Sequence, residues 1–336
     1  MTRCLVLLAA LALAAPTRAQ IEKRDVHIAV GGQNSFYYLP ITIAERQGYF
    51  KDEGLNVKIS DFAGGSVALR AVVGGSADVV SGAYEHTISL QSKKQYFQAF
   101  VAQGRLPQIA FGVATAKAGS VKSFKDLKGL KIGVSAPGSS THNLVKQLLT
   151  KGGLDPNKDA SIVGVGLGAQ AFAALKSGQI DAISNTDPVM TKLEQENAIK
   201  VIADTRTVKG TQEVWGAPLP AGVLHAAIEF VQKNPNTAQA LANAIVRADK
   251  WIAKASATDV AKVVPESFLM GDRALYLFSF DKVKEAISPD GIISDAGAKA
   301  TLQSLAAFDP GIKPAEIELA KTYTNEFAKK ANQKYK

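Results

Sequence analysis

Three consecutive hydroxyl residues and a histidine, from Ser139 to His142, form the run best suited to holding a small molecule. The run lies where a strand is expected to end and a helix to begin. Its hydroxyls therefore accompany the free backbone N–H groups of a first helical turn. Such a set can donate hydrogen bonds to an anion, and His142 would add positive charge when protonated. The alternative is that these side chains only cap the helix, which is worth about 1 kcal/mol.

Polar residues follow other expected strands in the same way. Asn34 and Ser35 come after the first strand and either bind a ligand or form a turn. Ser66 follows the second strand and either binds a ligand or caps a helix. Asp187, before Pro188, either orients a ligand amine or caps the next helix. The predicted ligand-binding set is Asn34, Ser35, Tyr37, Ser66, Tyr84, His86, Ser139, Ser140, Thr141, His142, Asn185 and Asp187.

Aromatic and arginine side chains near these loops have two interpretations each. Tyr37, Tyr38, Tyr84 and Trp215 could wall an organic ligand, although packing is the commoner role of such rings. Arg105 and Arg206 are the only arginines near the expected connections between lobes. Either could clamp a carboxylate or sulfonate, but we expect both on the surface.

Several kinds of chemistry are disfavoured by what the sequence lacks. The single cysteine, Cys4, precedes residue 20, so the rest of the chain offers no thiolate ligand or cysteine nucleophile. His86 and His142 are far apart and no carboxylate cluster accompanies them, so we predict no metal site. The glycines at Gly31-Gly32 lack the G-x-G-x-x-G spacing of a nucleotide fingerprint. We therefore expect no cofactor and no catalytic residue.

The chain from residue 25 onward has the pattern of an α/β fold. Short β-branched runs alternate with Ala-rich amphipathic segments, as in parallel strands crossed by helices. Strands are expected at residues 26–30, 55–59, 78–81, 132–134, 160–165, 182–185 and 200–204. Beyond about residue 227 the pattern becomes helical, with long helices expected at 235–255, 294–307 and 314–330. Ligands in such sheets bind beyond the carboxyl ends of the strands, which is where the polar loops fall.

A weak internal repeat bears on domain organisation. Gly75-x-x-Asp78 and Gly178-x-x-Asp181 each follow an apolar helix and open a strand. They are either ordinary helix-to-strand turns or a sign of two similarly built lobes, the second inserted into the first. With two lobes, we expect crossings at residues 110–115 and 203–212. The first lobe would then comprise residues 20–112 and 207–336, and the second lobe residues 113–206.

The N-terminal residues 1–19 have the pattern of a secretory signal peptide. Arg3 precedes an apolar run at 5–15, and Thr17-Arg18-Ala19 provides small residues before a cut. The run spans about half of the roughly 20 residues that a membrane helix needs. Cleavage would remove two of the 39 basic residues and leave a formal charge of 37 − 30, or +7. No clustered basic face is evident, so nucleic acid is not an expected partner.

Three further segments carry motifs in a fixed order. The stretch 38–50, YLPITIAERQGYF, is followed by DEGLNV at 52–57. LKGLKIGV at 127–134 precedes Pro137-Gly138-Ser139, and GQIDA at 178–182 precedes Asp187-Pro188. Together these segments resemble the nitrate/sulfonate/taurine class of periplasmic substrate-binding proteins, which also takes in relatives of the thiamine-pyrimidine synthases. The resemblance covers residues 25–204.

The resemblance implies a two-lobed protein with the type II periplasmic-binding-protein fold and a helical C-terminal part. Such a protein is a periplasmic monomer that delivers a small solute to the membrane permease of an ABC importer and is not an enzyme. Polar loops with little positive charge favour a small organic anion. The alternative is a biosynthetic enzyme of the thiamine-pyrimidine synthase or desulfinase type, both of which rely on cysteines that residues 20–336 lack. A sensory role, with the loaded form docking on a receptor, also stays open.

Overall fold

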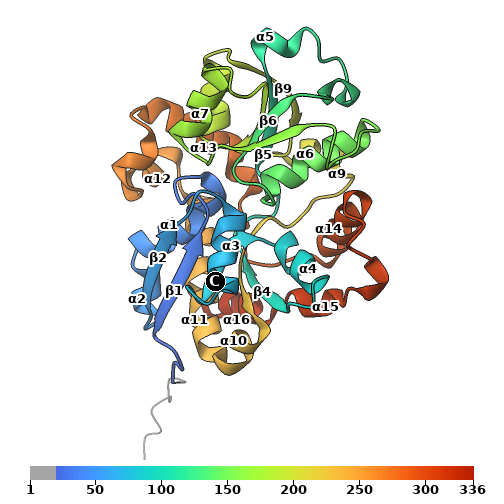
Figure 1. Ribbon diagram of the computed structural model, residues 1–336. Helices are drawn as coiled ribbons and strands as arrows, with labels where there is room; N and C mark the ends of the chain where they lie inside the picture. Colours follow the sequence, from blue (N-terminus) through green and yellow to red (C-terminus); the bar gives the residue numbers. More distant parts are fainter. Residues whose placement is uncertain (1–19) are drawn as a thin grey trace, which may run out of the picture.

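Two lobes, each built on a five-stranded sheet flanked by helices, make up the molecule (Figure 1). The computed structural model describes residues 20–336, so the predicted signal peptide lies outside the described residues. The α/β fold class predicted from the alternating pattern is confirmed.

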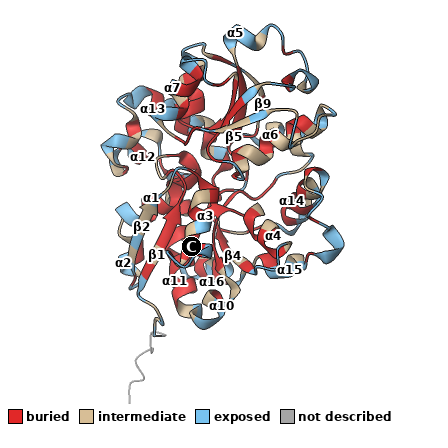
Figure 2. Cartoon of the chain, viewed as in Figure 1, coloured by how far each residue is buried: buried red, intermediate tan, exposed pale blue. Residues whose placement is uncertain are grey.

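The sheet of the first lobe has the strand order β2-β1-β3-β10-β4. Its strands are β1 (Asp25–Val30), β2 (Asn56–Asp61), β3 (Val79–Ala83), β4 (Phe97–Ala102) and β10 (Gly222–Ala227). β1 runs parallel to β2 and β3, whereas β10 is antiparallel to β3 and β4. β3 is buried along its whole length, as expected for a central strand with both faces covered. Figure 2 shows buried residues at the centre of each lobe and exposed residues on the outer faces of the surrounding helices.

Helices from both ends of the chain cover this first sheet. They are α1 (Leu39–Arg46), α2 (Tyr49–Asp52), α3 (Gly65–Val73), α4 (Glu85–Gln91), α10 (Ile228–Lys233), α11 (Pro235–Lys254), α12 (Ala257–Val263), α13 (Arg273–Val283), α14 (Asp295–Phe308), α15 (Leu319–Thr322) and α16 (Glu326–Lys334). α11 is the longest, and its apolar face is buried in the main core of the lobe. The expected single helix at 314–330 is wrong. The chain there is broken because Tyr323 forms a bridge with Ala99 in the edge strand β4.

The sheet of the second lobe repeats this plan, with the order β7-β6-β8-β5-β9. Its strands are β5 (Ile109–Ala114), β6 (Lys131–Val134), β7 (Ser161–Gly164), β8 (Ala182–Thr186) and β9 (Ile199–Asp204). Its helices are α5 (Thr115–Ala118), α6 (Ser140–Lys151), α7 (Ala169–Lys176), α8 (Val189–Gln195) and α9 (Val208–Trp215). In each sheet the fourth strand in this order, β10 or β5, runs antiparallel to its neighbours. It is also the strand that the chain forms directly after it crosses from the other lobe.

The two crossings are residues 103–108, between β4 and β5, and residues 205–221, between β9 and β10. The first crossing was expected at 110–115, but residues 110–114 pair with β8 and β9 inside the second sheet. We propose that the first boundary between the lobes lies at residues 103–108 and, because α9 packs against β9 in the second lobe, that the second boundary follows residue 215 instead of residue 206.

The internal repeat reflects two similarly built lobes. Asp78 accepts a hydrogen bond from the backbone N–H of His27 at 2.9 Å, and Asp181 accepts one from that of Lys131, also at 2.9 Å. Asp78 thereby links the start of β1 to β3, and Asp181 links the start of β6 to β8. The preceding glycines, Gly75 and Gly178, have φ of 76° and 74°, a left-handed conformation that glycine adopts without strain.

Candidate functional site

A small cavity lies between the lobes, where loops at the carboxyl ends of strands from both sheets face each other. Tyr37, Tyr38, Gly65, Ala83 and His86 line it from the first lobe, and Ile109, Ser135, Ser139, Ser140, Thr141, Leu167 and Thr186 from the second. The cavity volume that water can occupy is about 20 Å³. The lobes are therefore closed, with room for little more than water.

The start of α6, where the sequence predicts ligand-binding residues, provides the polar wall of the second lobe. Ser139, at the N-cap position, makes no side-chain cap bond. Its Oγ instead accepts from the backbone N–H of Ser66 at 3.0 Å and donates to Ser66 Oγ at 3.2 Å. Thr141 Oγ1 accepts from the backbone N–H of Ser135 at 3.0 Å. The backbone N–H groups of His142 and Asn143 already donate to the backbone oxygen of Ser139 at 2.8 and 3.0 Å, so the N–H groups of Ser140 and Thr141 are those left to meet a ligand.

His86 provides an uncommitted polar group on the first-lobe wall. Its side chain is 3% exposed, and neither ring nitrogen has a hydrogen-bond partner among the described residues. Burial lowers the pKa of His86 to about 4, so its ring is neutral at pH 7. A neutral imidazole presents one donor and one acceptor, and since the Gly138 backbone near the ring raises the pKa slightly, the acceptor nitrogen is the one fully available to a bound molecule.

Two tyrosine rings stand beside His86. Tyr37 and Tyr38 meet edge to face with ring centroids 4.9 Å apart. Burial raises the pKa of both phenols, so both stay protonated. The predicted aromatic wall is thus formed by Tyr37 and Tyr38, whereas Trp215 packs between apolar clusters of the two lobes.

The electrostatic character of the cavity is close to neutral. None of the residues that line it is a lysine or arginine. Glu85 lies next to it, where its Oε1 accepts from Asn143 Nδ2 at 2.7 Å, and burial raises the pKa of Glu85. Positive potential here comes from the helix start rather than from a charged side chain.

Three predicted residues join the lobes to each other instead of lining the cavity. Ser35 Oγ lies 2.7 Å from Thr186 Oγ1, a fully buried hydroxyl pair. Asn34 Nδ2 donates to the backbone oxygen of Leu167 at 3.4 Å. Ser66 Oγ donates to the backbone oxygen of Pro137 at 2.9 Å. These contacts can form only when the lobes are closed.

Four predicted residues lie away from the cavity. Tyr84 is buried against the C-terminal segment, where its hydroxyl pairs with Thr322 Oγ1 at 2.7 Å. Asn185 holds the loop at Gly166 through a 3.0 Å bond to its backbone oxygen. His142 accepts from the backbone N–H of Gly138 at 2.9 Å. His142 adds positive charge only at acidic pH, because burial and nearby Lys146 lower its pKa to about 4.

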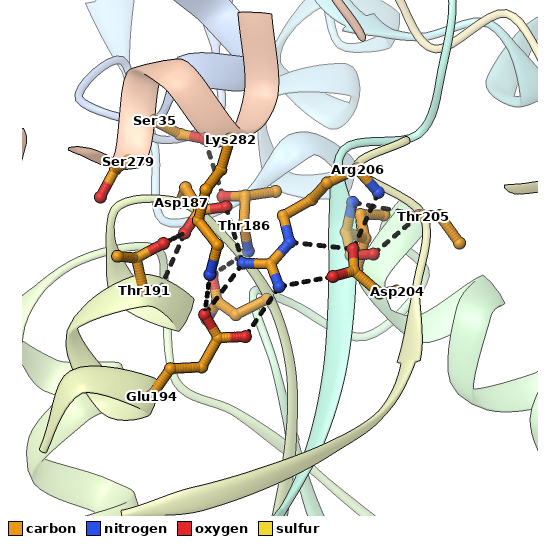
Figure 3. Close-up of polar contacts among 12 residues, drawn as sticks. Ser35, Thr186, Asp187, Thr191, Glu194, Asp204, Thr205, Arg206, Ser279 and Lys282 are labelled. Atoms are coloured by element: carbon orange, nitrogen blue, oxygen red, sulfur yellow. Dashed lines mark hydrogen bonds and ion pairs between the residues drawn. The ribbon is translucent and has the colours of Figure 1, made fainter. Parts of the chain in front are cut away.

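Asp187 is the fourth of these residues, and it lies in a buried ion cluster with Arg206 (Figure 3). Its Oδ1 accepts from the backbone N–H of Thr191 at 2.8 Å, which is the helix-capping role left open by the sequence. The expected surface placement of Arg206 is wrong, since the residue is 3% exposed and contacts three carboxylates. Arg105 does lie exposed and donates to the backbone oxygen of Glu285 at 2.8 Å.

Two cavity hydroxyls were not predicted. Thr186 is the last residue of β8, and Ser135 directly follows β6. Asn185 was predicted because it lies at the carboxyl end of an expected strand, and Thr186 lies at the same end. Successive side chains of a strand point to opposite faces, so only the three-dimensional register decides which neighbour faces the cavity.

Within residues 20–336, no group of three or more histidine, cysteine, aspartate or glutamate side chains is placed to hold a metal ion. Over the same residues, no helix is long and apolar enough to cross a membrane.

Comparisons with known proteins agree with the two-lobed architecture. A solved protein from Bordetella bronchiseptica RB50 is 57% identical, with a TM-score of 0.92 over 94% of this chain and 99% of that one. The alkanesulfonate-binding protein SsuA from Xanthomonas axonopodis pv. citri, solved with bound MOPS, is 18% identical, with a TM-score of 0.69 over 91% of this chain and 100% of its own. The fold is therefore that of the periplasmic binding proteins.

The family follows from the sequence match. The NMT1-like family model matches residues 19–264, so this chain belongs to the NMT1-like family. A binding protein of Bacillus subtilis, YtlA, is 24% identical over 78% of this chain and 77% of its own length. A 4-amino-5-hydroxymethyl-2-methylpyrimidine phosphate synthase of Schizosaccharomyces pombe is 30% identical, but over only 43% of this chain and 40% of its own.

Proposed function

We propose that this protein is the solute-binding component of an ABC importer and carries a small polar solute, without transforming it, to a membrane permease. The observation that carries the proposal is the closed cavity between two lobes, lined by hydroxyls, phenols and one uncommitted imidazole. Such a cavity binds by hydrogen bonds and exchanges its content through lobe opening. Membership of the NMT1-like family and the similarity to YtlA support the same function.

The solute that we propose is a small organic anion with a single negative charge. The unpaired N–H groups of Ser140 and Thr141 at the start of α6, together with the side chains of Ser140, Tyr37 and His86, can donate to one anionic group. A dianion is disfavoured because no lining side chain is cationic. We expect the protein to act in the periplasm as a monomer, after removal of residues 1–19.

The test is a thermal-shift screen of residues 20–336 against alkanesulfonates, carboxylates, nitrate, bicarbonate and pyrimidines, followed by calorimetry on each hit. A ligand that prefers the native state raises the melting temperature by mass action. His86→Ala and Ser140→Ala should each weaken the affinity for a hit at least tenfold. Ser120→Ala, which removes an exposed hydroxyl from α5's C-terminal turn, should leave it unchanged.

Two results would count against the carrier. Unchanged affinity in both cavity variants would place the binding site elsewhere. Covalent conversion of a pyrimidine or a sulfinate by the purified protein would instead support the enzyme alternative, to which the similarity of the fungal synthase points.

A further inference from the structure

Five charged side chains form a cluster beside the second crossing between the lobes (Figure 3). We refer to Asp187, Glu194, Asp204, Arg206 and Lys282 as the hinge ion cluster. Arg206 is its centre, with Nη1 at 3.2 Å from Asp187 Oδ2 and Nη2 at 2.7 Å from Glu194 Oε1 and 2.6 Å from Asp204 Oδ2. Its Nε also donates to Asp204 Oδ1 at 2.9 Å. Every donor face of the guanidinium is therefore occupied by second-lobe carboxylates.

Lys282 is the only member of the cluster that comes from the first lobe. It lies on α13, whose Tyr276 and Phe280 pack against Phe36 with ring centroids 4.5 and 6.0 Å away. Its Nζ contacts Glu194 Oε2 on α8 of the second lobe. The pair of Lys282 and Glu194 thus spans the gap between the lobes.

The members of the hinge ion cluster that come from the second lobe carry a net negative charge. Three carboxylates surround one guanidinium, which leaves two surplus negative charges, and Lys282 reduces the surplus to one. The side chains of Lys282 and Glu194 are 30% and 21% exposed, so water screens their attraction less than that of a surface pair. When the lobes part, Glu194 loses this counter-charge, and the second lobe alone cannot replace it.

The cluster is joined directly to the wall of the cavity. Asp187 follows Thr186, whose hydroxyl lines the cavity and pairs with Ser35. The backbone oxygen of Asp187 accepts from the N–H of Phe36 at 3.2 Å. Phe36 is also the ring on which α13 packs, so one closing motion completes the cavity and brings Lys282 to Glu194.

We propose that Lys282 is a positioning residue that acts as an electrostatic latch, favouring the closed state of the lobes without touching the solute. This inference deepens the proposed function by naming what regulates closure of the same cavity. Because the latch forms only in the closed state, its loss favours opening.

The test measures closure in the absence of any solute. In residues 20–336, which contain no cysteine, Ser66→Cys and Ser139→Cys place one thiol on each lobe where the native hydroxyls lie 3.2 Å apart. The rate at which these thiols form a disulfide under a fixed oxidant reports how often the lobes close. Adding Lys282→Met should slow this rate about fivefold, as expected for an ion pair worth about 1 kcal/mol. Lys282→Arg should restore it to within about twofold.

Three controls separate a latch from a general loss of stability. Lys284→Met removes a lysine of the same region whose Nζ donates to the first-lobe oxygen of Ala255, so the rate should not change. Lys282→Met combined with Glu194→Gln should be no slower than the slower single variant, because both remove the same pair. Salt at 1 M should slow the parent protein but not the Lys282→Met variant.

An unchanged rate in Lys282→Met, or equal slowing in Lys284→Met, would overturn the latch. Because no solute is added, these outcomes do not depend on the solute screen. A failed screen with a slowed Lys282→Met variant would reject the carrier function and keep the latch. A successful screen together with an unchanged disulfide rate in the Lys282→Met variant would keep the carrier function and reject the latch.

Discussion

His86 shows how a single side chain ties binding to stability. Its imidazole is buried, and no side chain among the described residues donates to it or accepts from it. A ligand that pairs with it would therefore stabilise the folded protein. Burial keeps the ring neutral and disfavours its protonation in the folded protein. The free energy of unfolding therefore depends on pH through His86.

We expect the free energy of unfolding to fall as pH falls below 6.5. The pKa of His86 is about 4 in the folded protein against 6.5 as its ordinary value, so the unfolded chain binds the proton first. The contribution of His86 to the loss between pH 7 and pH 5 is about 2 kcal/mol. Burial also lowers the pKa of His225 and acts in the same direction.

Urea unfolding of the parent and of His86→Gln at pH 7 and pH 5 checks this prediction. The variant should lose about 2 kcal/mol less than the parent over the same interval, whatever its stability at pH 7. Equal losses in the two proteins would show that His86 protonates as readily in the folded state as in the unfolded chain.

At the scale of secondary structure, the positions of the cavity walls depend on close backbone contact between loops. The loop after β1 touches the start of α3 at Gly31. A Cβ at Gly31 would lie 2.3 Å from the backbone nitrogen of Gly65, which lines the cavity. Only glycine allows this approach, since the obstructing atoms are backbone and cannot rotate away.

Gly31→Ala should therefore lower the free energy of unfolding by about 1–3 kcal/mol and displace the start of α3. Chemical denaturation measures the first effect, and the affinity for any solute found in the screen measures the second. Gly119→Ala is the matched control, because a Cβ there meets nothing within 4 Å and φ is −62°. It should stay within about 0.5 kcal/mol of the parent. Equal stability of the two variants would refute the close contact.

On the scale of the whole molecule, the contacts between lobes define a closed state. They include the pairs Ser35–Thr186 and Ser66–Ser139, the bond from Asn34 to Leu167, and the bond from Asn143 to Glu85. Leu167 also packs into the apolar core of the first lobe. A solute can enter only when these contacts separate, so opening must precede exchange.

A covalent link between the lobes should abolish exchange. Oxidised Ser66→Cys/Ser139→Cys joins positions 73 residues apart, and the model of chain entropy gives such a loop about 4 kcal/mol of stabilisation. We expect a higher melting temperature that no added solute raises further, with both effects reversed by dithiothreitol. The thermal-shift assay with and without reductant measures this. A solute response that persisted in the oxidised protein would indicate entry without lobe opening.

Local sequence patterns were sufficient to predict the fold class and most of the strands and helices. Pro40 lies in the first turn of α1, as its fixed φ favours, and Gly75 and Gly178 end helices as expected. The start of α6 was found for the same reason, because a polar run after an apolar strand is a local signal. The C-terminal helix at 314–330 was mispredicted because Tyr323 pairs with a strand more than 200 residues earlier.

What the sequence by itself determined was therefore the alternation of strands and helices, while the repeated lobe plan and the hydroxyl-rich loops of the cavity were predictions. Only the tertiary structure decided which of those side chains face the cavity and which join the lobes, and it alone buried Arg206. The physical reason is distance along the chain. Ser35 meets Thr186 across 151 residues and Glu194 meets Lys282 across 88, so no local pattern records either contact.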